Sequence, residues 1–259
     1  MLSVTSAQLD AWIAALMFPL ARILGLVASA PLLSNRMVPV RVRLAIGIAT
    51  ALAVMPALPP MPAVPTDSML ALAILVQQAF IGIAMGFMMR IVFAAVDVAG
   101  EMIGLQMGLS FAVFFSPQSG AQTAVVAEFL GLIALLVFVA LNGHLMLLGV
   151  LVASFEWLPV GTAAKADGWL LIARYGTVMF ASGLLLALPM VAALLITNTA
   201  LGVLTRAAPQ LNLFAVGFPI TLSVGFLVLL LSLNVIAPAL QGLFERGFDA
   251  IDQLLRAFV

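Results

Sequence analysis

The chain has 259 residues, of which 65% are hydrophobic and only 8% charged, and its ten acidic residues balance its ten basic ones. Soluble domains carry about 25% charged residues, so these few charges cannot solvate a globular surface. The composition predicts an integral membrane protein. The near-zero net charge argues against a nucleic-acid-binding surface, which needs clustered Lys and Arg.

Apolar segments of about 20 residues, the length that crosses the hydrocarbon core of a bilayer, predict membrane helices. The candidates cover residues 11–33, 44–58, 69–95, 124–155, 169–196 and 213–240. The second is short for a span, and 98–115 forms a further, shorter apolar piece. We therefore predict an all-α membrane protein, a single domain over 1–259 with about six apolar helical segments. Some of these should be broken, re-entrant or buried in protein.

The connections and the ends carry weaker signals. The first residues lack the basic region of a signal peptide, so the first apolar segment is expected to stay in the protein. Trp157 and Trp169 flank a polar loop and are expected at a membrane–water interface. Residues 241–258 place apolar side chains at helical spacing between charges. This pattern predicts an amphipathic helix that suits a membrane interface or a partner protein.

Charged residues inside apolar segments are functional candidates, because burying a charge in a membrane is costly. Arg90, Asp97 and Glu101 fall on one stripe of one helix at 100° per residue, and Glu128 is a single acid in another segment. The stripe fits three readings: a structural ion pair near an interface, a polar seam against a partner subunit or a water-filled lumen, or a proton relay.

Glycines accompany this stripe. Gly100, Gly104 and Gly108 recur at every fourth residue, and Gly82 and Gly86 make another such pair. Small residues at this spacing let membrane helices approach closely. The region is therefore expected to pack against protein and not against lipid.

Signatures of catalysis and of cofactor binding are missing from the sequence. There is no cysteine, and His144 is the one histidine, which excludes Cys-based and His-rich metal sites. No Ser-Gly pair stands in a G-x-S-x-G setting, and no nucleotide-binding P-loop occurs. The sequence predicts a protein that is not an enzyme and holds no cofactor or metal.

The stretch "GLSFAVFFSPQSGAQT" (108–123) combines an aromatic cluster with a neutral polar tail. Phe111, Phe114 and Phe115 would share one helix face, and Ser116-Pro117 should stop the helix. Gln118 to Thr123, including Gly120, carries no charge. We expect an aromatic helix end followed by a neutral loop.

The stretch "RAAPQLNLFAVGFP" (206–219) interrupts apolar sequence with polar and helix-breaking residues. Such a segment survives at membrane depth where protein or water satisfies its backbone; the plainer alternative is an ordinary interfacial loop. The residues concerned are Arg206, Pro209, Gln210, Asn212, Phe214, Gly217 and Pro219.

On these two stretches, together with "LNGHLML" (141–147), the chain resembles the FliR/SctT family, the R-type subunits of type III export gates. The resemblance covers essentially the whole chain. It implies helical hairpins within a closed helical assembly of FliP-like and FliQ-like subunits, with an FlhB-like protein at its base. It also implies a multi-pass protein of the bacterial inner membrane, at the flagellar basal body and in contact with membrane lipid, with no nucleic-acid partner.

The resemblance further implies a structural subunit of the channel that passes unfolded flagellar proteins. The plug of this channel would be formed by Phe111, Phe114, Phe115, Ser116, Pro117 and Gly120. Aromatic rings block and dewet a constriction, and a neutral loop beside them holds no charged cargo. The alternatives are a virulence-type, SctT-like secretion subunit and, less favoured, a small-solute transporter, which would need a polar midplane site and repeat symmetry.

Overall fold

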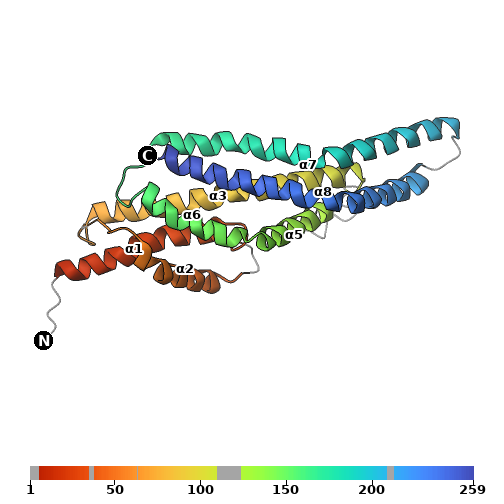
Figure 1. Cartoon of the computed structure of the whole chain (residues 1–259). Helices are drawn as coiled ribbons and strands as arrows, with labels where there is room; N and C mark the ends of the chain where they lie inside the picture. Colours follow the sequence, from red (N-terminus) through yellow and green to blue (C-terminus); the bar gives the residue numbers. More distant parts are fainter. Residues whose placement is uncertain (1–5, 35–37, 63, 110–123, 209–212) are drawn as a thin grey trace. The chain divides into compact units, whose positions relative to one another are not determined.

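The computed structural model describes residues 6–34, 38–62, 64–109, 124–208 and 213–259. Within these ranges every regular element is a helix (Figure 1). The elements are α1 (Ser6–Ser29), α2 (Val40–Val54), the short 3-10 helix η1 (Met55–Ala57), α3 (Met69–Gln106), α5 (Val125–Ala140), α6 (Gly143–Trp157), α7 (Ala166–Ala207) and α8 (Leu213–Ala257).

Five of these helices are long and apolar enough to cross a membrane. The α5–α6 pair adds a sixth candidate if it is taken as one span, and this pair is bent by 65° at the break between its two helices. At that break Asn142 adopts the left-handed conformation, with φ of 56°. The predicted all-α membrane fold, with about six apolar segments of which one is broken, is confirmed.

Several predicted helix boundaries were wrong. Residues 69–95 and 98–115 were treated as separate apolar pieces, but one helix, α3, begins in the first and runs unbroken to Gln106 in the second. It carries Arg90, Asp97 and Glu101 together, as expected. The last helix runs past residue 240 to Ala257, so the expected amphipathic helix at 241–258 is the end of α8.

The helices α7 and α8 are longer than a bilayer requires. They contain 42 and 45 residues, which makes them about 63 and 68 Å long against about 30 Å of hydrocarbon. Pro189 lies inside α7, and Pro219 and Pro238 lie inside α8. Membrane helices tolerate such prolines where neighbouring groups satisfy the freed carbonyls.

The chain forms two compact units. Unit 1 comprises Met1–Ile91, Asn142–Gly176 and Phe244–Val259, and unit 2 comprises Val92–Leu141 and Thr177–Leu243. Each of the helices α3, α7 and α8 therefore contributes to both units.

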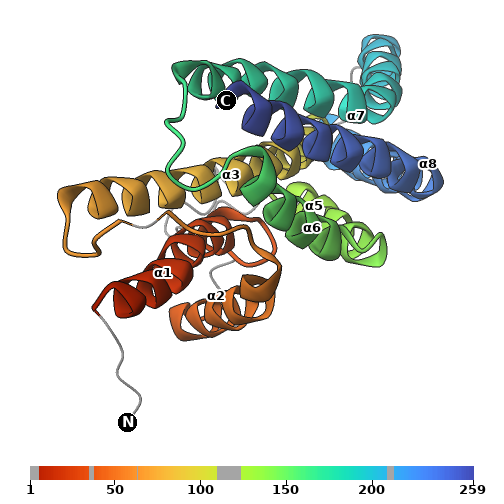
Figure 2. The same cartoon turned by 60° about the vertical axis from the view of Figure 1, so that its left-hand side comes forward.

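In unit 1, α1 lies between α2 and the first half of α3 (Figures 1 and 2). A Cβ atom at Gly82 of α3 would overlap the Arg22 carbonyl of α1, and one at Gly25 of α1 would overlap the Ala79 carbonyl of α3. A Cβ at Gly86 would overlap the Ser29 hydroxyl and the Ala30 backbone nitrogen. The predicted Gly82/Gly86 pair thus lies at a backbone-to-backbone helix contact.

The end of α8 packs inside unit 1. Its apolar side chains are buried: Leu243, Phe244, Phe248, Ile251, Leu254, Leu255 and Phe258, of which all but Leu243 belong to this unit. The Phe258 ring contacts Trp169 at 5.0 Å between ring centroids. The apolar face that was expected to await a membrane interface or a partner protein is therefore covered by the chain itself.

Candidate functional site

The first candidate region lies in unit 2, where α3 and α5 form an antiparallel pair. Gly100 touches Ala127 so closely that a Cβ at Gly100 would overlap the Ala127 backbone. The Phe93 and Phe138 rings meet edge to face at 5.6 Å. Because the partners of later α3 residues lie earlier on α5, the two helices run in opposite directions and form one of the predicted hairpins.

A glycine ends α3. Gly108 has φ of 79°, its N–H bonds to the Leu105 carbonyl, and the N–H of Leu109 bonds back to the Gly104 carbonyl at 3.1 Å. These two bonds make a Schellman cap, in which a residue with positive φ closes the helix end. Gly108 therefore terminates α3 and does not belong to the glycine ridge. The expected aromatic helix end at Ser116-Pro117 lies outside the described residues.

The proposed plug falls between these two helices. Phe111, Phe114, Phe115, Ser116, Pro117 and Gly120 lie outside the described residues. The residues that flank this stretch are placed: a Cβ at Gly104, near the end of α3, would lie 3.9 Å from Val126, at the start of α5. The 110–123 connection therefore starts and finishes at the same end of the closely packed α3–α5 pair.

Three of the predicted charges gather on this pair. Asp97 and Glu101 lie one turn apart on α3, Glu128 lies in the first turn of α5, and all three are exposed on this chain. The Asp97 carboxylate lies beside Gly131 of α5. Among the described residues no group of acidic, histidine or cysteine side chains could hold a metal ion.

The remaining member of the predicted stripe is Arg90. Arg90 is exposed on the part of α3 that belongs to unit 1. Unit 2 contains a single basic residue in its sequence, Arg206. The sequence of unit 2 therefore holds three acidic residues and one basic residue.

The second candidate region joins α7 to α8 in unit 2. Arg206 is exposed in the last turn of α7, where its charge complements the negative end of the helix dipole. Pro209, Gln210 and Asn212 lie outside the described residues.

The second half of this stretch is regular helix. Phe214, Gly217 and Pro219 belong to α8, Gly217 is buried and Pro219 is exposed. The interpretation of Gly217 and Pro219 as breaks was wrong, because α8 continues through both residues, and membrane helices tolerate a proline where neighbouring groups satisfy the freed carbonyl.

The structure also reveals a buried arginine that the sequence reasoning missed. Arg22 of α1 is fully buried in unit 1 and is the largest side chain to be so. Its Nε donates to Oε1 of Gln78 in α3 at 2.7 Å, and its Nη1 donates to the Ser154 carbonyl and hydroxyl at 2.8 and 3.0 Å. Its Nη2 donates to the Leu158 carbonyl at 2.9 Å.

Neutral groups stabilise the positive charge of Arg22, which forms no ion pair among the described residues. Ser154 and Leu158 stand at the C-terminal end of α6, where unsatisfied carbonyls carry partial negative charge. The guanidinium also lies 4.1 Å from the centre of the Phe155 ring. Arg22 thus caps α6 and joins α1, α3 and α6 through one side chain.

A sequence signal for Arg22 did exist. It is the one charged residue within the apolar segment 11–33, and the rule that singled out Arg90 applies equally to it. Its partners could not be read in the same way, because they lie 56, 132 and 136 residues away in the chain.

Comparison with known proteins identifies the family. Residues 13–247 match the family described as bacterial export proteins, family 1. The chain belongs to this family. This export protein is 44% identical to flagellar biosynthetic protein FliR of Escherichia coli and 42% identical to that of Pectobacterium carotovorum, over 98% of each chain. It is 30% identical to FliR of Bacillus subtilis over 90% of this chain and 92% of that one.

These matches confirm the resemblance to FliR, and the relatives' names favour the flagellar branch over the virulence branch. The export protein is thus a multi-helix membrane protein of a flagellar biosynthesis family. The two stretches on which the resemblance was recognised, 108–123 and 206–219, fall in the sequence range of unit 2, whereas the buried Arg22 site belongs to unit 1.

Proposed function

We propose that this flagellar export protein is a structural, pore-forming subunit of the export gate, without catalytic activity. It would assemble in the bacterial inner membrane, at the basal body, with FliP-like and FliQ-like subunits and an FlhB-like protein. The charges of α3 and α5 support this assembly: Glu101 and Glu128 are exposed on an apolar unit whose sequence holds one basic residue. Carboxylates in that setting need protein or water next to them and not lipid.

Within this function, we propose that residues 111–120 plug the channel. The observation that carries the proposal is the clamped base of the connection: α3 is closed by the Gly108 cap, and α5 packs against Gly100 and Gly104. A loop that must move aside for an unfolded polypeptide needs ends that stay fixed. Its aromatic and neutral composition suits a seal that blocks ions and does not retain charged cargo.

Co-purification with the neighbouring gate subunits, followed by imaging of the complex, tests the proposed assembly. We expect a mixed helical complex in which this chain contributes the α3–α5 and α7–α8 pairs to the wall of a central channel. A chain that purifies by itself as a stable, functional monomer would contradict the proposal and favour the small-solute transporter.

A further inference from the structure

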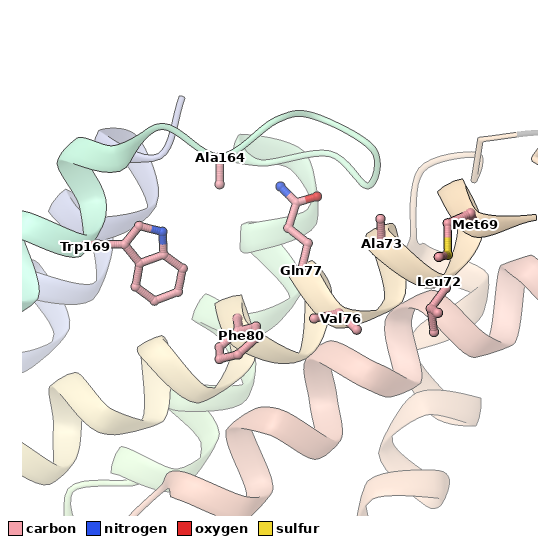
Figure 3. Close-up of a pocket in the computed structure, with 8 residues that line it drawn as sticks. All are labelled: Met69, Leu72, Ala73, Val76, Gln77, Phe80, Ala164 and Trp169. Carbon is pink, nitrogen blue, oxygen red and sulfur yellow. The ribbon is translucent and has the colours of Figure 1, made fainter.

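An apolar groove opens on the surface of unit 1. It has a volume of about 610 Å³ and runs along the first three turns of α3 beside the α6–α7 loop. Figure 3 shows Trp169 and Phe80 at one end of the groove and Met69 and Leu72 at the other. The remaining lining residues are Ala73, Val76, Gln77 and Ala164.

The lining of the groove is mostly apolar. Gln77 is the one amide side chain in its lining, and its nitrogen already donates to the Thr162 carbonyl at 2.7 Å; the other polar group of the lining is the indole N–H of Trp169. This bond ties the α6–α7 loop to α3 and so fixes the upper wall of the groove. An occupant of this groove is therefore held by apolar contact alone along most of its length.

The lining is unlike the places where helices of this chain pack together. At the α1–α3 contact, Gly25, Gly82 and Gly86 let two backbones touch, as small residues do in membrane helix pairs. Around the groove, long flexible side chains project outward, and Met69 is 81% and Phe80 52% exposed. The axis of a second helix would lie farther from α3 here than that of α1 does, whereas a flexible hydrocarbon chain can fill the irregular space between such side chains.

One end of the groove has the features of a membrane–water interface. The Trp169 ring, 42% exposed, contacts Phe80 at 6.2 Å and Phe258 at 5.0 Å. Trp rings favour the headgroup level of a bilayer. The side chain of Lys165 is exposed next to Ala164 in the lining, and its backbone N–H bonds to the Phe258 carbonyl at 2.9 Å. Asp167 follows in the first turn of α7.

We propose that this groove binds one acyl chain of a phospholipid from the surrounding bilayer, with the headgroup phosphate beside Trp169 and Lys165. The acyl chain lies along α3 from Phe80 toward Met69. The groove belongs to unit 1, so the site does not depend on the proposed plug, which belongs to unit 2.

Photolabelling of the complete gate tests the site. The gate is reconstituted in phosphatidylethanolamine–phosphatidylglycerol vesicles that contain a phosphatidylglycerol with a diazirine on one acyl chain, and labelled peptides are mapped after irradiation. Val76→Trp fills the groove and should reduce labelling of residues 69–80 about tenfold, the effect of displacing about two methylene groups from apolar contact. Leu70→Trp is the matched control, because Leu70 is exposed on the same helix but does not line the groove.

The outcomes separate a bound lipid from its alternatives. Labelling of 69–80 that exceeds labelling of the exposed apolar face of α7 around Leu185, and that falls with Val76→Trp but not with Leu70→Trp, supports the site. Labelling that is equal on both faces, or insensitive to Val76→Trp, would mean ordinary surrounding lipid and would overturn it. So would a crosslink from a photoreactive residue at Val76 to another gate subunit. Lys165→Gln should lower the labelling, and an unchanged signal would overturn the headgroup placement.

Discussion

Arg22 and Gln78 form a fully buried hydrogen-bonded pair, in which the guanidinium Nε of α1 donates to the amide oxygen of α3 at 2.7 Å. The amide nitrogen of the same Gln78 is buried without a hydrogen-bond partner among the described residues. The amide oxygen of Gln78 therefore has a hydrogen-bond partner, and its amide nitrogen has none within the described ranges. Carboxylate chemistry would suit this position at least as well as the amide.

This asymmetry predicts opposite effects of two substitutions at Gln78. Gln78→Leu leaves the Nε of Arg22 buried without an acceptor and should destabilise the chain by about 1–3 kcal/mol. Gln78→Glu replaces the unpartnered amide nitrogen by a second acceptor oxygen and forms a charge-assisted bond to Arg22, so stability should be kept or raised. Thermal unfolding of the purified gate measures both variants, and a Glu variant as unstable as the Leu variant would refute the pairing.

The effect of replacing a helical glycine by alanine should depend on which atoms the added Cβ would contact. Gly82→Ala and Gly100→Ala place a methyl group on a neighbouring backbone, at Arg22 and Ala127, and should lower co-purification with the other gate subunits. Gly149→Ala and Gly202→Ala are the controls in units 1 and 2, because a Cβ there has open space. The controls should be neutral or more stable by about 0.5–1 kcal/mol, since Ala is the better helix former. Equal yields from all four variants would contradict these contacts.

The chain without its partner subunits should be unstable. Glu101 and Glu128 are exposed on a unit that is otherwise apolar, so in an isolated chain they would face lipid or detergent tails. We expect aggregation or a broad size distribution in mild detergent, and improvement when the partner subunits are co-expressed. Size-exclusion chromatography and thermal scans decide the matter, and a monodisperse, heat-stable monomer would show that these acids need no partner.

Removal of the proposed plug should open the resting channel to ions. Deletion of residues 116–122, or replacement of Phe111, Phe114 and Phe115 by Ala, takes the aromatic seal away and lets water wet the constriction. Because the cluster is expected at a helix end and not in the middle of a core, assembly should escape the penalty of about 3–5 kcal/mol typical of buried Phe-to-Ala changes. Membrane potential and small-molecule uptake in cells with the complete gate report the leak.

Co-purification of the gate subunits is the control for that experiment. Variants that fail to assemble would show that the three rings belong to a packed core. Variants that assemble normally yet stay as ion-tight as the parent would show that the aromatic cluster is not the seal.

Hydropathy and residue spacing by themselves determined the class of this protein, because both depend on local properties. Ten acidic and ten basic residues in 259 cannot solvate a soluble surface, and long apolar runs must hydrogen-bond internally as helices. The Gly82/Gly86 spacing marked a close helix contact, since residues four apart share a helix face. The two unusual stretches were sufficient to recognise the family.

Only the tertiary structure decided where helices end and which polar groups are buried. The end of α3 depends on the positive φ of Gly108, a residue that the sequence had placed in a helix-packing ridge. Gly100 and Gly202 are both glycines in apolar helices. A neighbouring backbone touches Gly100, whereas a Cβ at Gly202 would have open space. Arg22 is held by groups from α3, from α6 and from the residue after α6, far away in sequence. Each of these facts arises from contacts between distant parts of the chain, which local periodicity does not encode.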